Sequence, residues 1–484
     1  MQLSRRRLAL ILVVLLGGAT AALITASTQA AISTGTSTAT TASTPVNSAI
    51  PTTGQVPTTC TGPTVNSNDT ITFCLTAPQA TNVQLNFQNM LGLSPAADAF
   101  AMTEGPGGLW YITVEPPAGA NWYGYNFTVD GAHVADPDNR DIWTGVPTFF
   151  SPIGAWSMVM VPGAASEYIA EANVPHGAVS TVYYYSALAQ TERRMTVYTP
   201  PNYDSHRAYP VLYLLHGAGG NDTDWIVNMR SNFILDNLIA QGKAAPMIVV
   251  MPDTNVGTFG GLTGSVTVDQ FIQQELLGTI IPYIEHNYRT LPGPQNRGLA
   301  GLSLGSFHTR DGLFVDPTEF SYYGLFSNGA LLPTQITDLT QNHPDLIRGV
   351  ARAERKGVIK EIWISQGAEE PQVIAVFTNA LQPTLALFDQ NGIKYTYVPG
   401  ASIGAIYGHV WDTWRKDLVA FAPQLIQGPR GRGHRSARPH VDMTVGAGPA
   451  VCLAAVGGRL GTGTPSRTLH AAPAKITVCS PARG

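Results

Sequence analysis

The pentapeptide Gly301-Leu302-Ser303-Leu304-Gly305 follows a short apolar stretch at residues 298–302 and precedes a segment with helical spacing. A serine at this point of a strand–turn–helix unit fits the nucleophile-elbow pattern Gly-x-Ser-x-Gly. Small residues two positions to either side let the strand and the helix approach, and the turn presents the serine Oγ at the helix N-terminus. Because glycine and serine are also common in ordinary turns, the prediction depends on the surrounding pattern.

The surrounding pattern alternates strands with helices. Strands are expected at 195–199, 209–215, 247–251, 298–302, 322–326, 361–365 and 394–398, and helices at 233–240, 268–288 and 373–390. The run 209–215 is nearly continuous in apolar residues, as is typical of a central strand covered on both faces. This alternation predicts a doubly wound sheet. Together with the elbow, it indicates an α/β-hydrolase fold.

A glycine-rich turn, Leu214-Leu215-His216-Gly217-Ala218-Gly219-Gly220, ends an apolar strand well before the elbow. We expect the backbone amides of Ala218 and Leu304 to form an oxyanion hole. His216 is then a structural residue. The alternative is an ordinary turn at the end of a strand, and the order of strand, turn and later elbow makes it the less favoured interpretation.

A general base should follow the serine in the chain. His409 is the preferred candidate, because Tyr407-Gly408-His409-Val410-Trp411 lies after the last predicted strand and just before a helix. His308 lies on the helix after the elbow and is expected to pack or face solvent, and His343 lies in a predicted loop. The remaining candidates lie in the C-terminal tail and are His434, His440 and His470.

The acid that orients the base is expected in the loop after the strand at 361–365, where Glu369 and Glu370 occur. A carboxylate bonded to the Nδ1 atom of a histidine fixes the tautomer and stabilises the imidazolium. Either glutamate gives the chain order serine, acid, histidine that this fold requires. The alternative for either residue is a solvated carboxylate in a loop.

The region before the α/β pattern has short apolar runs at 70–75, 83–87, 109–114 and 122–129, separated by Gly, Pro and Asn turns. This spacing predicts a small all-β sandwich. Trp110 and Trp122 could be exposed and bind glycans. Burial in the sandwich core is the favoured alternative, because large aromatic residues are commonly buried.

Both ends of the chain have simple compositions. Ser4-Arg5-Arg6-Arg7, the apolar residues that follow and small residues at 26–31 predict a signal peptide over 1–31, with a retained membrane anchor as the alternative. Residues 32–59 are rich in Ser and Thr and are expected to form a flexible linker. Residues 428–484 are expected to form a tail of low order. The protein is therefore expected to be secreted or attached to the cell surface.

The four cysteines agree with export. Cys60 and Cys74 lie at the start of the β region, and Cys452 and Cys479 lie in the tail, so two local disulfides are plausible, although four cysteines permit three pairings. No cysteine lies in the predicted catalytic region, which excludes a cysteine nucleophile there.

The charge of the chain argues against a polyanionic partner. The 484 residues have a net charge of -4, and only 12% of them are charged. We therefore expect no nucleic-acid partner and a neutral or weakly polar substrate. No integral membrane role is expected beyond a possible N-terminal anchor.

Residues 176–421 resemble the esterase D superfamily, which includes feruloyl, acetylxylan and siderophore esterases and mycolyltransferases. The resemblance rests on a set of motifs along this stretch: residues 194–201 with Tyr203, residues 209–217, Trp225, Pro282-Tyr283-Ile284-Glu285, the elbow, and Gly408-His409-Val410-Trp411 with Trp414. The preceding β region, with Gly107-Gly108-Leu109-Trp110 and Tyr123-Gly124-Tyr125-Asn126-Phe127, resembles immunoglobulin-like modules of glycan-active enzymes. The chain is thus most similar to two-domain feruloyl and acetylxylan esterases.

The resemblance implies an immunoglobulin-like sandwich at 60–165 and an esterase domain at 176–427. It implies a serine esterase that acts on feruloyl or acetyl esters of plant cell-wall polysaccharide and needs no metal or organic cofactor. The alternatives are a siderophore or other small-ester esterase, an acyltransferase of the mycolyltransferase type, and a noncatalytic glycan-binding protein. The family spacing from Gly367 favours Glu370 over Glu369 as the acid, and Trp225 is expected to bind substrate.

The chain departs from the family pattern at three places. Ser306 replaces a frequent second glycine and could crowd the elbow, and Glu370 stands where aspartate is commoner. Arg310 and Asp311 place charge on the helix after the elbow, for which the sequence offers no interpretation.

Overall fold

The computed structural model describes residues 48–54, 56–89, 97–144, 155–260, 264–327, 329–373 and 375–425. The predicted signal peptide, most of the predicted linker and the predicted tail, with Cys452 and Cys479, lie outside these ranges. Within them, no helix is both long and apolar enough to cross a bilayer.

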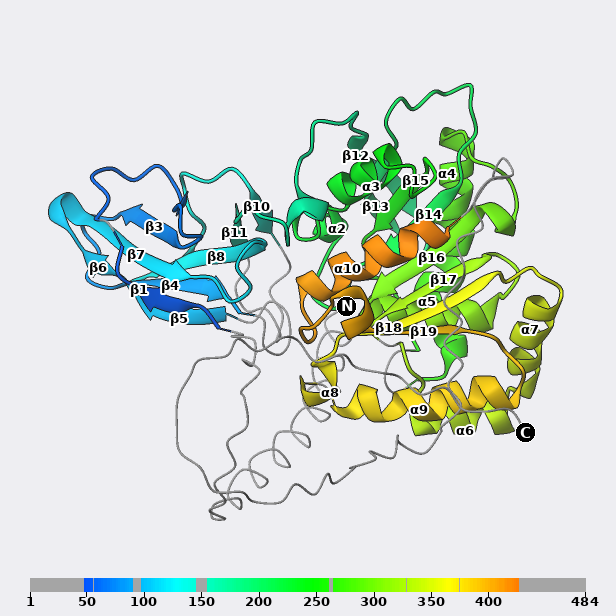
Figure 1. The fold of residues 1–484 in the computed structure, drawn as a ribbon. Coiled ribbons are helices and arrows are strands. Elements are labelled where there is room, and N and C mark those ends of the chain that lie inside the picture. The colour runs from blue at the N-terminus through cyan, green and yellow to red at the C-terminus, as the bar shows by residue number, and fades with distance from the viewer. Residues whose placement is uncertain are drawn as a thin grey trace, which may run out of the picture. The chain divides into compact units, whose positions relative to one another are not determined.

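A large mixed sheet lies in the part of the described chain after residue 177 (Figure 1). Its strands run in the order β12-β13-β15-β14-β16-β17-β18-β19. β13 pairs antiparallel with both β12 and β15, and from β15 onward all neighbours are parallel. The strands are β12 (Ala178–Ser186), β13 (Thr191–Thr199), β14 (Val211–Leu215), β15 (Ile248–Pro252), β16 (Arg297–Leu302), β17 (Tyr322–Phe326), β18 (Glu361–Gln366) and β19 (Thr396–Pro399).

Both faces of this sheet are buried. Successive side chains of a strand point to opposite faces, and in β14 Tyr213 and Leu215 join one hydrophobic cluster while Leu212 and Leu214 join another. The first cluster contains Phe314, which lies on a helix that follows β16. Because β14 is covered on both sides, its sequence is apolar throughout.

The helices pack against these two faces. They are α2 (Asp224–Val227), α3 (Ser231–Ala240), the π-helical η4 (Phe271–Ile280), α4 (Ile281–Asn287), α5 (Leu304–Val315), α6 (Pro333–Gln341), α7 (Pro344–Arg355), α8 (Glu370–Val373), α9 (Ala375–Gln390) and α10 (Trp411–Phe421). Short 3-10 turns are η1 (Pro106–Gly108), η2 (Glu167–Ile169), η3 (Val266–Val268), η5 (Pro294–Asn296), η6 (Gly400–Ile403) and η7 (Ala422–Gln424). Apolar residues of α5 and α7 belong to one cluster, and those of α3 and α10 to the other.

The predicted α/β class is confirmed. The seven predicted strands correspond to β13 through β19, and the predicted helices correspond to α3, to η4 with α4, and to α8 with α9. The prediction missed β12, since the first strand expected in this part of the chain was that at 195–199. The first four residues of β12 are all exposed, as are Tyr183 and Tyr185, and this edge strand lacks the continuous apolar run of a central strand.

The part of the described chain before residue 161 consists of two antiparallel sheets (Figure 1). The first contains β1 (Ile50–Thr52), β2 (Thr64–Val65), β3 (Ile71–Thr76), β6 (Thr103–Glu104) and β7 (Leu109–Glu115). The second contains β4 (Val83–Gln88), β5 (Ala97–Ala101), β8 (Trp122–Val129), β9 (Ala132–Val134), β10 (Ile142–Thr144) and β11 (Ala155–Met160). We call this pair of sheets the β-sandwich.

The β-sandwich is built around a shared aromatic core. Phe73 of the first sheet packs against Phe87 and Tyr125 of the second, with ring centroids 5.6 and 4.5 Å apart. Trp110 is buried in this core. Trp122 is also buried, but it belongs to the cluster that contains α3 and α10, and its indole N–H donates to the Val227 carbonyl oxygen. Neither residue is an exposed glycan-binding platform, and burial in the sandwich core holds for Trp110 alone. The indole N–H of Trp110 donates to the Ala77 carbonyl oxygen, and this bond lies within the sandwich.

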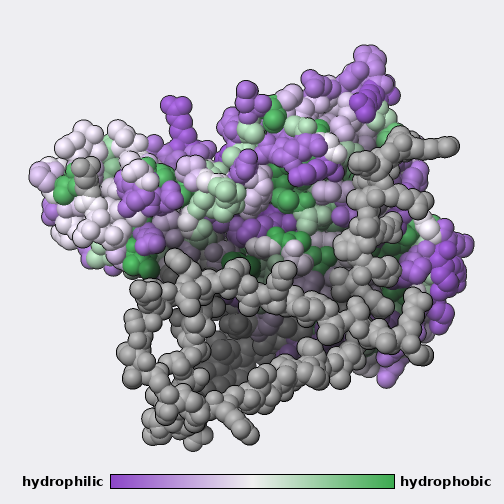
Figure 2. Space-filling view, in the orientation of Figure 1, coloured by the Kyte–Doolittle hydropathy of each residue, from purple (hydrophilic) through white to green (hydrophobic). Residues whose placement is uncertain are grey.

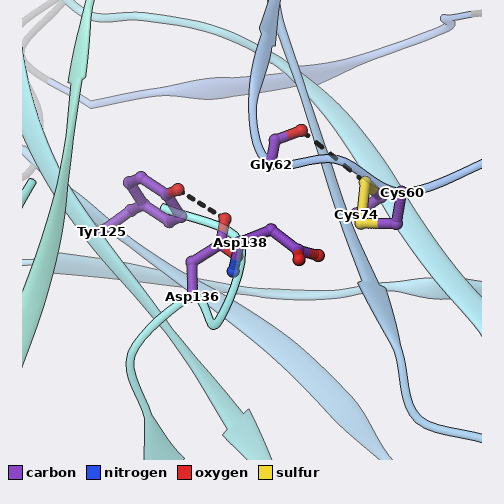
Figure 3. Close-up of a disulfide and its surroundings, with 6 residues drawn as sticks. All are labelled: Cys60, Gly62, Cys74, Tyr125, Asp136 and Asp138. Carbon is purple, nitrogen blue, oxygen red and sulfur yellow. Dashed lines mark hydrogen bonds between the residues drawn. A yellow bond between two sulfur atoms is a disulfide. The ribbon is translucent and has the colours of Figure 1, made fainter. Parts of the chain in front are cut away.

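One predicted disulfide is present in the described residues. Cys60 and Cys74 are joined, and the sulfur of Cys74 lies 3.7 Å from the Gly62 carbonyl oxygen (Figure 3). Nearby, the Tyr125 hydroxyl donates to Asp136, whose other carboxylate oxygen accepts the Asp138 backbone N–H. The bridge therefore ties β3 to the segment that enters the sandwich.

The surface of the described chain is mixed in polarity. Figure 2 shows one face on which hydrophobic residues form small patches between hydrophilic ones. Scattered apolar residues are normal on protein surfaces. Most of the large apolar side chains are instead gathered in three internal clusters, one on each face of the central sheet and one in the β-sandwich.

Candidate active site

Ser303 lies at the sharp turn between β16 and α5. Its backbone has φ 51° and ψ -114°, outside the regions that non-glycine residues favour. Its N–H donates to the Phe326 carbonyl oxygen of β17 at 3.2 Å, which helps to hold the turn in this conformation. Strained backbone of this kind persists only where surrounding contacts determine it, and it is frequent at functional sites. Ser303 is half-buried, so its hydroxyl remains accessible.

The glycines beside Ser303 permit a close approach of strand and helix. A Cβ atom on Gly305 would lie 2.6 Å from the Leu215 carbonyl oxygen and 2.7 Å from that of His216. A Cβ atom on Gly301 would lie 2.5 Å from the Gly305 carbonyl carbon. Ser306 does not crowd the turn, since its Oγ donates to the Ser303 carbonyl oxygen at 2.6 Å.

Gly305→Ala is expected to lower the free energy of unfolding by about 1–3 kcal/mol, because the added methyl group meets backbone oxygens that cannot rotate away. The displaced turn should also lower kcat for ester hydrolysis by about tenfold or more. Urea denaturation and steady-state kinetics measure both effects. Gly349→Ala on α7 is the matched control, since its Cβ would meet only a Pro317 side-chain atom at 3.7 Å. Equal free energies of unfolding and equal kcat values in the two variants would contradict the packing argument.

Ser303, His409 and Glu370 form a continuous chain of hydrogen bonds. The Nε2 atom of His409 lies 2.8 Å from the Ser303 Oγ, and its Nδ1 atom lies 2.7 Å from the Glu370 Oε1. His409 and Glu370 are 7% and 3% exposed. The structure thus brings together the serine, the histidine and the favoured glutamate from three separate loops.

Neighbouring groups hold Glu370 and His409 of this hydrogen-bond chain in their orientations. The second carboxylate oxygen of Glu370 accepts the Gly367 backbone N–H at 2.8 Å. The His409 ring packs edge-on against Trp414, with centroids 4.9 Å apart. Glu369, the alternative acid, bonds through its backbone N–H to the Tyr407 carbonyl oxygen, and the carboxylate bonded to His409 is that of Glu370.

The predicted oxyanion turn lies beside Ser303. A Cβ atom on Gly217 would be 3.3 Å from the Ser303 Cβ atom, which brings the 216–220 turn against the serine. Leu304 is the first residue of α5, so its N–H has no acceptor within the helix. Ala218 is exposed at the surface of the turn. His216 is buried, with Nδ1 against the Gly217 carbonyl oxygen and Nε2 accepting the Thr254 backbone N–H.

The predicted substrate contact at Trp225 does not fit the structure. Trp225 is 1% exposed, its indole N–H donates to the Leu215 carbonyl oxygen, and its ring packs on Phe326. A side chain enclosed in this way cannot touch a substrate. Trp225 instead supports the end of β14, from which the oxyanion turn departs.

The charged residues on the helix after the elbow are buried together. Arg310 donates to Asp311 and to the Ala330 carbonyl oxygen. Burial raises the pKa of Asp311 well above its usual range, although the Arg310 guanidinium lowers it. His308 is also buried, with its Nδ1 atom 2.6 Å from the Asp269 carboxylate. These residues pack behind the elbow, so His308 is not the partner of Ser303.

Asp417 is a buried acid near the site that the sequence analysis did not single out. It lies on α10 next to Ser365 of β18, and burial raises the pKa of its carboxyl well above the usual range. The Ser365 hydroxyl lowers this pKa, while the negative charge of Glu370 raises it. Asp417 lies three residues after Trp414 and therefore on the same, apolar face of α10. This spacing is the sequence signal that could have indicated its burial.

The chain is similar in sequence to known xylan-degrading enzymes. It is 33% identical over 372 residues to an "Endo-1,4-beta-xylanase/feruloyl esterase" of Xylanibacter ruminicola, a match that covers 75% of this chain and 46% of the relative. It is 34% identical over 128 residues to "Endo-1,4-beta-xylanase Y" of Acetivibrio thermocellus, covering 24% of this chain and 11% of the relative. The chain thus spans less than half the length of either relative.

Similar solved structures include two esterases. The enterobactin esterase of Shigella flexneri has a TM-score of 0.48 at 18% identity, covering 75% of this chain and 96% of that one. A ferulic acid esterase of Anaeromyces mucronatus has a TM-score of 0.43 at 24% identity, covering 54% and 94%.

A family model described as "Putative esterase" matches residues 186–425. This segment contains β13 through α10, and with them the elbow, the oxyanion turn and the His409 loop. The chain belongs to this family of esterases.

Proposed function

We propose that this protein is a serine esterase that hydrolyses carboxylic esters through an acyl-enzyme. The observation that supports this function most directly is the hydrogen-bond chain from Ser303 Oγ through His409 to Glu370. A serine hydroxyl is a weak nucleophile unless an adjacent base accepts its proton. A buried carboxylate on the far nitrogen of that base holds the tautomer that leaves Nε2 free to accept the proton.

In the first half of the reaction, Ser303 Oγ attacks the ester carbonyl carbon while His409 Nε2 takes the hydroxyl proton. Glu370 stabilises the resulting imidazolium. The amides of Ala218 and Leu304 donate hydrogen bonds to the oxyanion of the tetrahedral intermediate. When the C–O bond to the alcohol breaks, His409 returns its proton to the departing alkoxide oxygen.

In the second half, water replaces the alcohol. His409 removes a proton from water as its oxygen attacks the acyl carbon, and the protonated imidazole then donates to Ser303 Oγ as the acid leaves. These steps use only side chains and backbone amides of this chain.

The proposed substrates are feruloyl or acetyl esters of plant cell-wall polysaccharide. The name of the Xylanibacter relative, which joins a xylanase with a feruloyl esterase, supports this choice. We further propose secretion or display at the cell surface, an immunoglobulin-like identity for the module at 60–165, and an esterase domain at 176–427. The disulfide between Cys60 and Cys74 supports an oxidising compartment.

The same acyl-enzyme could pass its acyl group to a sugar hydroxyl, which would make the protein an acyltransferase. Siderophore esters and other small esters are alternative substrates. A noncatalytic glycan-binding role would require a disrupted site, whereas the distances among Ser303, His409 and Glu370 are those of good hydrogen bonds.

The purified protein is expected to hydrolyse p-nitrophenyl acetate. It is also expected to hydrolyse methyl ferulate faster than it hydrolyses methyl esters of unrelated aliphatic acids. Product release is followed by absorbance and chromatography. A preference for an aliphatic ester over both ferulate and acetate would contradict the proposed substrate class. Transfer of the acyl group to added xylo-oligosaccharide in preference to water would instead favour the acyltransferase.

A further inference from the structure

The β-sandwich contacts the two loops that form opposite sides of the proposed active site. β10 contacts α2, and Trp143 of β10 packs against Trp411 of α10. α2 follows the oxyanion turn, and α10 begins two residues after His409. Contacts at these two helices can therefore set the position of both an oxyanion donor and the base.

The contact at the oxyanion turn is a buried hydrogen bond. The indole N–H of Trp143, on β10, donates to the Asp224 Oδ1 atom at 2.7 Å. On the other side of the same carboxylate, the Oδ2 atom lies 1.9 Å from where a Cβ atom on Gly220 would stand. Asp224 thus fills the space between the β-sandwich and the turn. Burial raises the pKa of the Asp224 carboxyl to about 6. Because this carboxylate is removed from water, loss of the Trp143 donor would leave its Oδ1 atom without that compensating hydrogen bond.

The contact at the His409 loop is a buried polar network. Asn121, which directly precedes β8, donates through Nδ2 to the Asp412 Oδ1 atom at 2.8 Å. Its Oδ1 atom accepts from Arg415 at 2.7 Å, and Arg415 also donates to the Trp122 carbonyl oxygen. Arg415 is fully buried. Since buried polar groups are costly to leave unpaired, this network fixes the first turn of α10 against the sandwich.

Apolar contacts hold the His409 loop from the same side. Tyr407 and Val410, which flank the histidine, belong to the hydrophobic cluster of the β-sandwich rather than to either cluster of the central sheet. Trp411 packs edge-on against Trp143, with ring centroids 5.7 Å apart. The backbone around His409 is therefore anchored to the sandwich, while its ring faces Ser303 and Glu370.

We propose that the β-sandwich is a built-in positioning element of the active site, in which Trp143 positions the oxyanion turn and Asn121 positions the His409 loop. Neither residue touches the triad, and each acts through a hydrolase residue, Asp224 or Asp412. This inference rests on the proposed function, because it assigns a catalytic consequence to the two loops. Displacement of catalytic groups by about 1 Å can cost up to a hundredfold in rate.

The test compares Trp143→Phe and Asn121→Ala with Trp110→Phe in the full chain. Trp110→Phe is the matched control, because it also deletes one indole hydrogen bond of the sandwich, here the bond to the Ala77 carbonyl oxygen, which involves neither loop. With p-nitrophenyl acetate, which is too small to need the sandwich for binding, we expect kcat to fall about tenfold in the first two variants. KM should stay within about twofold, and Trp110→Phe should match the wild type in both constants.

Backbone hydrogen exchange, measured by mass spectrometry, gives a readout that does not depend on activity. Exchange should become faster at 216–228 in Trp143→Phe and at 405–415 in Asn121→Ala, and at neither segment in Trp110→Phe. Unchanged kcat and unchanged exchange in the first two variants would overturn the positioning role. If the wild type hydrolyses no ester, the proposed function fails, and the exchange pattern alone decides whether the sandwich orders these loops.

Discussion

Ser303→Ala is expected to reduce kcat for ester hydrolysis by about four to six orders of magnitude. The variant removes the oxygen to which the His409 Nε2 atom is hydrogen-bonded. The fold should survive, because alanine is smaller than serine and the turn keeps its backbone bond to Phe326. The measurement is kcat for p-nitrophenyl acetate, with far-UV circular dichroism to verify folding.

Ser306→Ala provides the matched control for this experiment. It removes a hydroxyl from the same turn, but that hydroxyl donates to the Ser303 carbonyl oxygen and does not contact His409. Its kcat should remain within about tenfold of the wild type. A Ser303→Ala protein that kept more than one per cent of the activity would rule out an acyl-enzyme on this residue. Mass spectrometry of a slowly hydrolysed ester should likewise find the acyl group on the peptide that contains Ser303.

The central sheet and the elbow were predictable because their signals are local. β14 and β17 are buried on both faces, so their sequences are continuous apolar runs. The glycines around Ser303 mark backbone contacts that no side chain could fit. His409 was identified by its position after the last predicted strand, since the fold dictates which loop supplies the base.

The features that the sequence did not predict depend on contacts between distant parts of the chain. Trp225 was assigned to substrate binding, yet its burial depends on the packing of α2 against β14 and Phe326. Arg415 and Asn121 lie almost 300 positions apart, and neither sits in a recognisable pattern. A buried arginine on a helix cannot be distinguished from a solvated one until its partners in the other sheet are known.

The choice between two adjacent glutamates shows the same limit at the scale of a single loop. Glu369 and Glu370 follow the same strand and differ by one position, so residue type and chain order permit either as the acid. The short α8 decides the geometry. It begins at Glu370 and directs this carboxylate back to the Gly367 N–H and the His409 Nδ1 atom.

Glu370→Gln is therefore expected to lower kcat by about three to four orders of magnitude. The glutamine has nearly the same shape, but its neutral amide cannot stabilise the imidazolium that forms when Ser303 loses its proton. If its NH2 group turns toward Nδ1, it also selects the wrong tautomer of His409. Glu369→Gln makes the same chemical change one residue earlier and should keep kcat within about threefold. A large loss in Glu369→Gln with little loss in Glu370→Gln would assign the acid to the other glutamate, and equal small losses would show that neither carboxylate orients the base.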